Sequence, residues 1–188
     1  MPHPDPDPAL LPRWLAGDAG AFDALVRGWE RPVGRLLARL TGCPDAARDL
    51  TQEVFLRVYR SAGAYTDAGR FKPWLFRIAV NLARDAARRS ARRPETPFTG
   101  PDPPAKPVSA DVSAEHRELA DAVAGALAEL SLPLREVVVL RHYEDLSFEA
   151  MARLLDMPAT TLKSRFAVAL TKLRESLTAR GFGPEEAS

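Results

Sequence analysis

The sequence has a single cysteine and none of the common catalytic motifs, and these absences narrow its possible functions. With Cys43 alone among 188 residues, no intramolecular disulfide can form and a cysteine-based zinc site is not expected. There is no glycine-rich phosphate loop and no HExxH or GxSxG pattern. His116 and His142 have no cysteine or carboxylate partner in a motif. We therefore expect no catalytic residues, no metal ligands and no cofactor, and predict that the protein is not an enzyme.

Long apolar runs are also missing. No stretch approaches the roughly 20 consecutive apolar residues that a membrane-spanning helix requires. The start, Met-Pro-His-Pro-Asp-Pro-Asp-Pro, lacks the basic and apolar parts of a signal peptide. We expect a cytoplasmic protein with no membrane insertion, in which residues 1–9 form a disordered acidic arm.

The net charge is only +1, yet charges of each sign are clustered along the chain. Acidic residues gather in 45–53 and 111–121, whereas Lys and Arg gather in 72–93 and 163–180. Clustering of this kind indicates separate surfaces for a cationic and an anionic partner.

Apolar residues recur at helical spacing over almost the whole chain, which predicts an all-α fold. In the first half the spacing predicts helices over residues 10–16, 19–29, 33–40 and 45–62. Pro32 is expected to force a kink or a new helix start. The helix over 45–62 has an apolar core side, and its opposite side carries Asp49, Gln52, Glu53 and Leu56.

Residues 71–93 predict a helix with an apolar side and a basic stripe. The apolar side contains Phe71, Leu75, Ile78, Leu82 and Ala86. The stripe contains Arg77, Asn81, Arg84 and Arg88. The planar fork of arginine suits phosphate, and asparagine can pair with base edges. Taken alone, the pattern fits a solvated basic surface as well as it fits a nucleic-acid-binding helix.

A proline-rich segment divides the chain into two parts. Residues 93–108 contain six prolines and no apolar period, which is typical of an extended linker. We therefore predict two small helical domains, over residues 10–93 and 113–180, joined by a linker over 94–112 and followed by a tail over 181–188.

The second part predicts a helix-turn-helix. A helix from about residue 113 is expected to bury Leu119, Val123, Leu127 and Leu130. Ser131 is expected to cap the next helix, and Ser147 the helix over 148–155. A short turn over 156–158 then leads to a final helix over 159–177, expected to bury Leu162, Phe166, Leu170, Leu173 and Leu177. Two helices joined by such a turn, the second with basic flanks, form the pattern that enters the major groove of DNA.

Two blocks of sequence resemble extracytoplasmic-function (ECF) sigma factors, the small alternative sigma subunits of bacterial RNA polymerase. Asp-Leu-Thr-Gln-Glu-Val-Phe-Leu-Arg-Val-Tyr over 49–59, with Trp-Leu-Phe-Arg-Ile-Ala-Val-Asn over 74–81, is similar to sigma domain 2. Leu-Ser-Phe-Glu over 146–149, with Thr-Leu-Lys-Ser-Arg over 161–165, is similar to sigma domain 4. The two blocks occur in the family's order, with a linker between them.

The resemblance implies partners and a role for each surface. Core polymerase, through its β′ clamp helices, would bind Asp49, Gln52, Glu53 and Leu56. The −10 promoter element would bind Tyr65, Arg70, Lys72, Trp74, Arg77, Asn81, Arg84 and Arg88, with a flipped base near Asn81. The −35 element would bind Thr160, Thr161, Lys163, Ser164, Arg165, Ala167, Val168 and Thr171. The β flap and an anti-sigma factor are further implied partners.

The chain departs from the family pattern at two positions of the helix-turn-helix, and Pro133 also lies slightly later than the family's usual proline. Ala150 stands where a second acid usually follows Glu149, and Val168 stands where arginine is usual. Because valine cannot donate to guanine or phosphate, the affinity for the −35 element is expected to be weaker, or its preference to shift toward thymine methyl groups. Two alternatives stay open: a helix-turn-helix regulator that acts without polymerase, and a degenerate sigma-like interaction protein.

Overall fold

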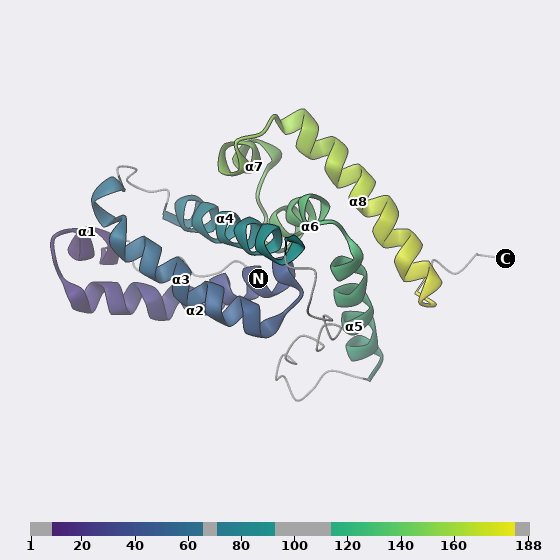
Figure 1. Ribbon diagram of the computed structural model, residues 1–188, viewed down its shortest axis with the longest axis horizontal. Coiled ribbons are helices and arrows are strands. Elements are labelled where there is room, and N and C mark those ends of the chain that lie inside the picture. Colours follow the sequence, from purple (N-terminus) through teal and green to yellow (C-terminus); the bar gives the residue numbers. More distant parts are fainter. Residues whose placement is uncertain (1–8, 66–70, 93–113, 183–188) are drawn as a thin grey trace.

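The computed structural model describes residues 9–65, 71–92 and 114–182, and every regular element in these ranges is helical (Figure 1). The elements are α1 (Leu10–Leu15), α2 (Ala19–Thr41), α3 (Pro44–Arg60), η1 (Ala62–Ala64), α4 (Phe71–Ala91), α5 (Ala114–Glu129), α6 (Leu132–Val138), η2 (Val139–Tyr143), α7 (Phe148–Leu155) and α8 (Ala159–Ala179). The all-α prediction is confirmed. Residues 1–8, Arg70, the predicted linker over 94–112 and most of the tail lie outside the described residues.

The turn between α1 and α2 is fixed by a charged cap. Gly17 has φ +100°, a conformation that glycine adopts without strain. Asp18 then caps α2 by accepting a hydrogen bond from the Ala21 amide at 3.1 Å. Arg13 donates to the same carboxylate, with Nη2 2.7 Å from Oδ2, so α1 is tied to the start of α2.

α2 is one continuous helix of 23 residues, so the prediction of two helices that end and restart around Pro32 is wrong. Proline removes one helical hydrogen bond, which normally interrupts a helix. Here Trp29, Val33 and Leu36 are almost fully buried on either side of Pro32. Burial of these side chains on one face outweighs the missing bond, so the helix runs on until Gly42 ends it with φ +68°.

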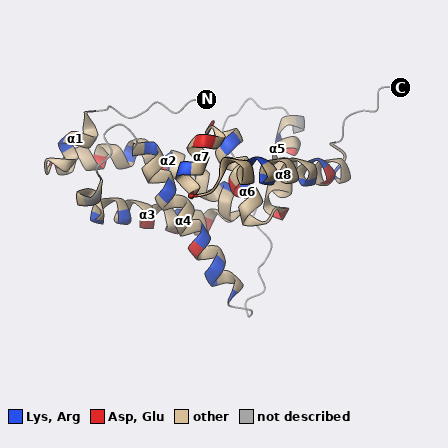
Figure 2. Ribbon diagram, turned by 90° about the horizontal axis from the view of Figure 1, so that it is seen from above, with Lys and Arg blue, Asp and Glu red and all other residues tan. Residues whose placement is uncertain are grey.

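α3 and α4 pack on α2 through the apolar sides that the sequence predicts. Leu50, Val54 and Val58 of α3 are buried, as are Leu75 and Leu82 of α4. The Trp29 ring packs against two rings of α4, with its centroid 5.9 Å from that of Phe71 and 6.1 Å from that of Phe76. The buried faces leave the acidic side of α3 outward. The carboxyl-terminal turns of α4 project from the body of the molecule and carry several basic residues (Figure 2).

The second region begins with α5, in which residues 116–121 are exposed. Leu119 is 42% exposed, so its predicted core position is wrong; Leu127 and Leu130 are buried as expected. Ser131 occupies the N-cap position of α6, but its side chain makes no capping hydrogen bond. The prediction that Ser131 caps this helix is therefore wrong. α6 continues into the π-helical turn η2, and Asp145 ends this segment with φ +54°.

α7 and α8 form the predicted helix-turn-helix. Ser147 caps α7 by accepting a hydrogen bond from the Ala150 amide at 3.1 Å, and Asp156 ends α7 with φ +54°. On α8, Leu162 and Ala169 are fully buried. Leu170 is 44% exposed, so the predicted burial of this residue is wrong, because the core of this region receives the neighbouring Ala169 instead.

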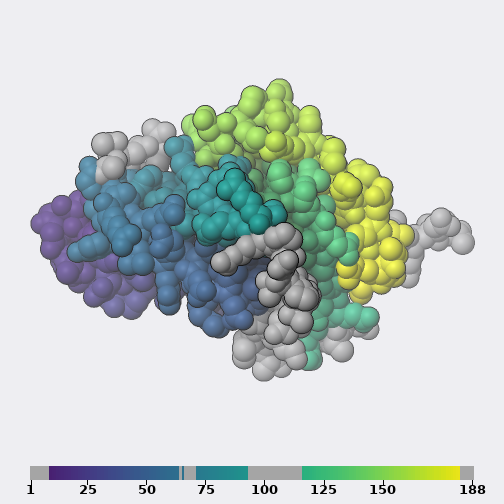
Figure 3. Space-filling model, viewed as in Figure 1, coloured from purple at the N-terminus to yellow at the C-terminus, as the bar shows by residue number. Residues whose placement is uncertain are grey.

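The two regions pack directly against each other. One cluster of buried apolar side chains runs from α1–α4 into α5–α8 without interruption. α2 contacts α5, α6 and η2, and α4 contacts α6 and α7. In the space-filling view the amino-terminal and carboxyl-terminal halves form a continuous surface (Figure 3). Residues of the predicted binding surfaces can therefore lie in the contact between the two regions.

Candidate nucleic-acid and partner-protein interface

The outward side of α3 is an acidic face with exposed apolar residues. Asp49 and Gln52 are exposed, Glu53 is half-buried, and Leu56 is 50% exposed. Glu53 accepts a hydrogen bond from Arg57 Nε at 3.0 Å, one helical turn further on. Tyr59, 62% exposed, follows Leu56 at a spacing of three residues and extends the same face. Tyr59 was not predicted as part of this face, although its spacing from Leu56 is visible in the sequence.

The basic stripe of α4 is divided between solvent and the second region. Asn81 is exposed, and Arg88 is exposed and pairs with Asp85 on its own helix. Arg77 Nη2 donates to the carbonyl oxygen of Arg153 in α7. Arg84 donates through Nε and Nη2 to the two carboxylate oxygens of Glu136 in α6, both at 2.7 Å. Two of the three stripe arginines therefore contact the second region, which the sequence analysis did not foresee.

The aromatic residues predicted to stack on bases form a cluster of their own. The Tyr65 ring lies 5.0 Å from that of Trp74 and 6.1 Å from that of Phe71. Tyr65 is only 9% exposed, so its ring faces the protein interior and does not fit the predicted stacking role. Trp74 is half-buried and keeps part of its surface outward.

The outward face of α8 carries the predicted −35 residues. Thr160, Lys163, Ser164, Ala167, Val168 and Thr171 are exposed, and Thr161 and Arg165 are half-buried. Arg165 Nη1 lies 3.2 Å from the Met157 sulfur, and Ser164 Oγ donates to the Thr160 carbonyl at 3.1 Å. Lys163 Nζ is 5.8 Å from the centre of the Phe148 ring. Neutral and basic side chains thus share one accessible helix face, as a major-groove helix requires.

Three charged residues of the second region are buried against the first, and sequence reasoning missed all of them. Arg135 is 9% exposed, Glu136 1% and Glu144 4%. The hydrogen bond with Glu136 raises the pKa of Arg84, whereas burial raises the pKa of the Glu144 carboxyl. Lys72 Nζ lies 3.8 Å from Glu144 Oε2. A signal was present in the sequence, since Arg135 and Glu136 interrupt the otherwise apolar run over 132–140.

Comparison with known proteins identifies the family. Residues 25–93 match the Sigma-70 region 2 family, and residues 120–173 match the Sigma-70 region 4 family. The chain is 31% identical over 168 residues to the RNA polymerase sigma-H factor of Pseudomonas aeruginosa, covering 85% of this chain and 87% of the relative. It is 32% identical to the ECF RNA polymerase sigma-E factor of Haemophilus influenzae, covering 85% of this chain and 88% of that protein. The chain belongs to the ECF sigma factors.

Solved structures support the same family and fold. CnrH, in complex with the cytosolic domain of CnrY, aligns with this ECF sigma factor with a TM-score of 0.67 and 27% identity, over 93% of this chain and 99% of that one. RpoE of Bartonella quintana, in complex with the anti-sigma factor NepR, has the same fold, with a TM-score of 0.71 over 84% of this chain and 96% of that one at 21% identity. In this ECF sigma factor, region 2 contains α3 and α4, and region 4 contains the helix-turn-helix.

Two features are absent from the described parts of this ECF sigma factor. No three His, Cys, Asp or Glu side chains lie together there as a metal ion would require. Within the same residue ranges, no helix combines the length and apolar character needed to cross a membrane.

Proposed function

We propose that this ECF sigma factor binds core RNA polymerase through the outward face of α3. The proposal rests on one observation: Leu56, half exposed, sits in a row with the carboxylates of Asp49 and Glu53. An exposed apolar side chain among acidic ones is suited to a partner helix that carries both basic and apolar residues. Gln52 belongs to the same face, which would bind the β′ clamp helices of the polymerase.

Region 2 binds the −10 element through α4. Asn81 is exposed and can reach a base edge, whereas Arg77, Arg84, Arg88 and Lys72 supply cations for the strand backbone. The outward part of the Trp74 ring offers a stacking surface. Arg70 belongs to the same proposed set. Tyr65 is left out because its ring is buried.

Region 4 binds the −35 element through the outward face of α8 and contacts the β flap. Lys163 and Arg165 flank this face and contact phosphates, while Thr160 and Ser164 offer short polar contacts. Val168, 49% exposed at the centre of the face, offers a methyl contact to thymine and excludes an arginine–guanine pair.

The protein acts in the cytoplasm as an initiation factor without an enzymatic activity of its own. An anti-sigma factor is proposed as a regulatory partner. The support for this partner is the likeness in fold to RpoE of Bartonella quintana, whose structure was solved with the anti-sigma factor NepR.

Reconstitution with core polymerase tests the proposal. The purified chain is mixed with core enzyme, and the transcription start sites on genomic DNA are mapped. We expect start sites that share a two-part upstream sequence and that disappear when the chain is omitted. Specific duplex binding by the chain alone, without productive complex formation, would instead favour a regulator that acts without polymerase.

A further inference from the structure

The outward side of α2 carries a row of arginines that none of the surfaces described above uses. Arg27, Arg31 and Arg35 recur every four residues and are exposed, and Arg39 continues the row one turn further on, half-buried. Side chains four residues apart lie on neighbouring turns of the same side of a helix. At 1.5 Å of rise per residue, the three exposed arginines of this α2 row span about 12 Å.

The α2 row is unfavourable for the helix that carries it. Like charges four residues apart repel each other and lower the stability of a helix. On α3, by contrast, Arg57 is paired with Glu53 at 3.0 Å within the same helix. Among the described residues, neither Arg27 nor Arg31 has a carboxylate partner of this kind. Two cations that repel each other and have no partner are suited to an anion from outside the chain.

The length and chemistry of the row favour the phosphate backbone of DNA as this anion. The planar fork of arginine donates two hydrogen bonds to a phosphate group. A duplex carries one phosphate per 3.4 Å of axis on each strand, so a row of about 12 Å passes three or four phosphates of one strand. α2 contains no Asn or Gln that could pair with a base edge. The row is therefore expected to hold DNA without reading its sequence.

The aromatic residues of α2 favour a duplex over a single strand. Trp29 is 2% exposed, and the Phe22 ring packs between helices, 5.0 Å from the ring of Trp14 and 5.2 Å from that of Tyr59. Single-stranded DNA is usually held by aromatic rings on which its bases stack. Because neither ring of α2 is free for stacking, the row fits the outside of a duplex better than a strand with unstacked bases.

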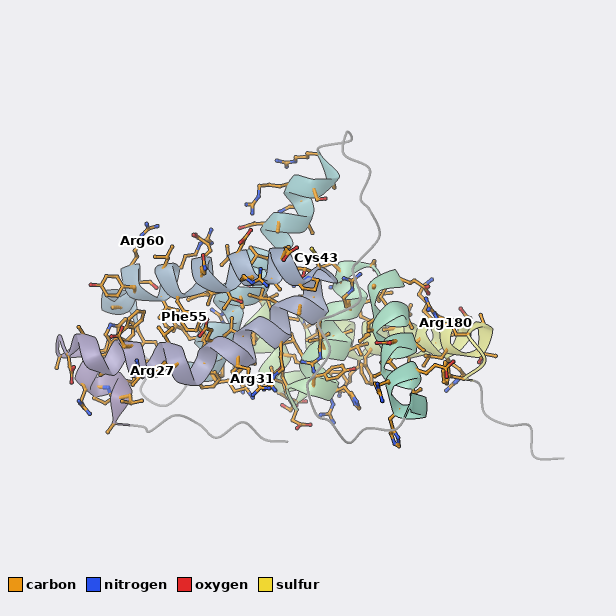
Figure 4. All side chains as sticks on the ribbon, turned by 90° about the horizontal axis from the view of Figure 1, so that it is seen from below. Arg27, Arg31, Cys43, Phe55, Arg60 and Arg180 are labelled. Atoms are coloured by element: carbon orange, nitrogen blue, oxygen red, sulfur yellow. The ribbon has the colours of Figure 1, made fainter. Side chains whose placement is uncertain are left out.

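We propose that the α2 row is a third DNA-binding surface of this sigma factor, which binds the phosphate backbone of duplex DNA independently of sequence. The row contains none of the residues assigned above to polymerase, the −10 element or the −35 element, so the inference goes beyond the proposed function. Figure 4 places Arg27 and Arg31 on α2, across Phe55 from Arg60 of α3. Charge removed from α3 therefore provides a matched control.

A salt titration tests the row. The full chain is added to a fluorescein-labelled mixed-sequence duplex at several salt concentrations, and fluorescence anisotropy gives the affinity. If Arg27 and Arg31 each contact one phosphate, Arg27→Gln with Arg31→Gln should reduce the slope of log affinity against log salt concentration by about 2. The difference in affinity from the wild type should accordingly shrink by roughly tenfold between 50 and 200 mM salt.

The control variant distinguishes the row from a general effect of charge. Arg48→Gln with Arg60→Gln removes the same charge from exposed positions of α3 and should leave the slope unchanged. Arg27→Lys with Arg31→Lys keeps both charges and should keep the slope. Circular dichroism checks that every variant is as helical as the wild type. A wild-type slope in the glutamine variant of α2, or an equal loss in the α3 control, would overturn the proposal.

A combined variant tests whether the row is separate from α8. Lys163→Ala alone should reduce the slope by about 1, and Lys163→Ala added to both glutamine substitutions in α2 should reduce it by about 3. If the α2 substitutions cause no further loss once Lys163 is absent, the row is not a surface of its own.

Two other probes identify a different occupant. A labelled single strand of mixed sequence and labelled poly-L-glutamate are titrated with the wild type and with Arg27→Gln, Arg31→Gln. A loss of affinity confined to the single strand would overturn the choice of a duplex. A loss confined to poly-L-glutamate would show that the row binds an acidic protein segment instead. All these titrations use the chain without polymerase, so their outcome is independent of whether the chain initiates transcription with core enzyme.

Discussion

Arg135 of α6 donates a hydrogen bond from Nη1 to the carbonyl oxygen of Leu40 in α2, 2.8 Å away. Leu40 lies in the last turn of α2, where helix carbonyls have no partner within the helix. Nη2 of the same guanidinium reaches the carbonyls of Ala128 and Leu130 at the end of α5. One buried cation therefore satisfies the carboxyl ends of two helices, one from each region, where the helix dipole favours positive charge.

Replacement of Arg135 should be strongly destabilising. Arg135→Ala leaves three carbonyl groups without their donor, two of them in buried hydrogen bonds, and we expect a loss of about 3 kcal/mol in the free energy of unfolding. Arg135→Lys, with a single ammonium group, should recover part of this loss. Urea denaturation measures the difference, with exposed Arg31→Ala as the control. A loss no larger than that of Arg31→Ala would contradict this account of the helix ends.

Charge reversal on α3 should abolish polymerase binding. Asp49→Lys with Glu53→Lys replaces both carboxylates of the proposed face, while an unfavourable charge pair between position 53 and Arg57 costs only a few tenths of a kcal/mol. We expect loss of co-elution with core polymerase and an unchanged circular dichroism spectrum. The control reverses Asp23 and Glu30, two exposed acids of α2. Retained co-elution of the α3 variant would rule out this face.

Asn81→Ala should relax base selection at one position of the −10 element. A good base-edge contact provides about 1–3 kcal/mol of discrimination between bases. Transcription from a promoter library with a randomised −10 element, carried out with reconstituted holoenzyme, should show reduced preference at a single position. Ser90→Ala, at an exposed site of the same helix, is the control. A promoter preference identical to that of the wild type would argue against base reading by Asn81.

Lys163→Ala should weaken duplex binding and its dependence on salt. If Lys163 contacts one phosphate, its loss reduces the slope of log affinity against log salt concentration by about 1. Lys163→Arg keeps the charge and should keep the slope. Anisotropy titrations at several salt concentrations measure both values. An unaltered slope in Lys163→Ala would mean that the ammonium group touches no phosphate.

Glu144→Gln should stabilise the protein at neutral pH. Burial raises the pKa of Glu144 above its ordinary value, and this effect exceeds the opposing influence of Lys72, Arg39 and Arg35. The native state thus holds the proton more tightly than the unfolded chain, so wild-type stability falls as pH rises through the native pKa. Because glutamine does not titrate, the stability of Glu144→Gln does not fall in this way as pH rises.

The advantage of Glu144→Gln over the wild type should therefore shrink as pH is lowered through that range. Chemical denaturation at a series of pH values measures it, with exposed Glu175→Gln as the control. A variant that is less stable than the wild type at neutral pH would show that the cations around Glu144 outweigh its burial.

Much of the helix pattern could be predicted because each helix of this fold has its own apolar side. The helix-turn-helix, the cap at Ser147 and the buried sides of α3 and α4 all follow from local spacing. Local rules failed where tertiary packing outweighs them. α2 continues through Pro32 because the residues around it are buried. On α8, Ala169 is buried instead of Leu170.

The division of the α4 stripe could not be predicted from spacing. Helical periodicity places Arg77, Arg84 and Arg88 on one side, but it contains no information about which partner reaches each guanidinium. That information depends on α6 and α7, more than 40 residues further along the chain. Arg84 differs from Arg88 only because Glu136 lies opposite it.

The pairing of Arg84 with Glu136 also affects what happens when region 2 or region 4 is exchanged between sigma factors. A chimaera that joins this region 2 to a foreign region 4 keeps this bidentate contact only if the new region supplies a carboxylate opposite Arg84. Without it, the guanidinium of Arg84 would lose both of its hydrogen bonds to region 4. When regions are exchanged between such factors, the contacts between region 2 and region 4 have to be conserved, as well as the promoter preference of each region.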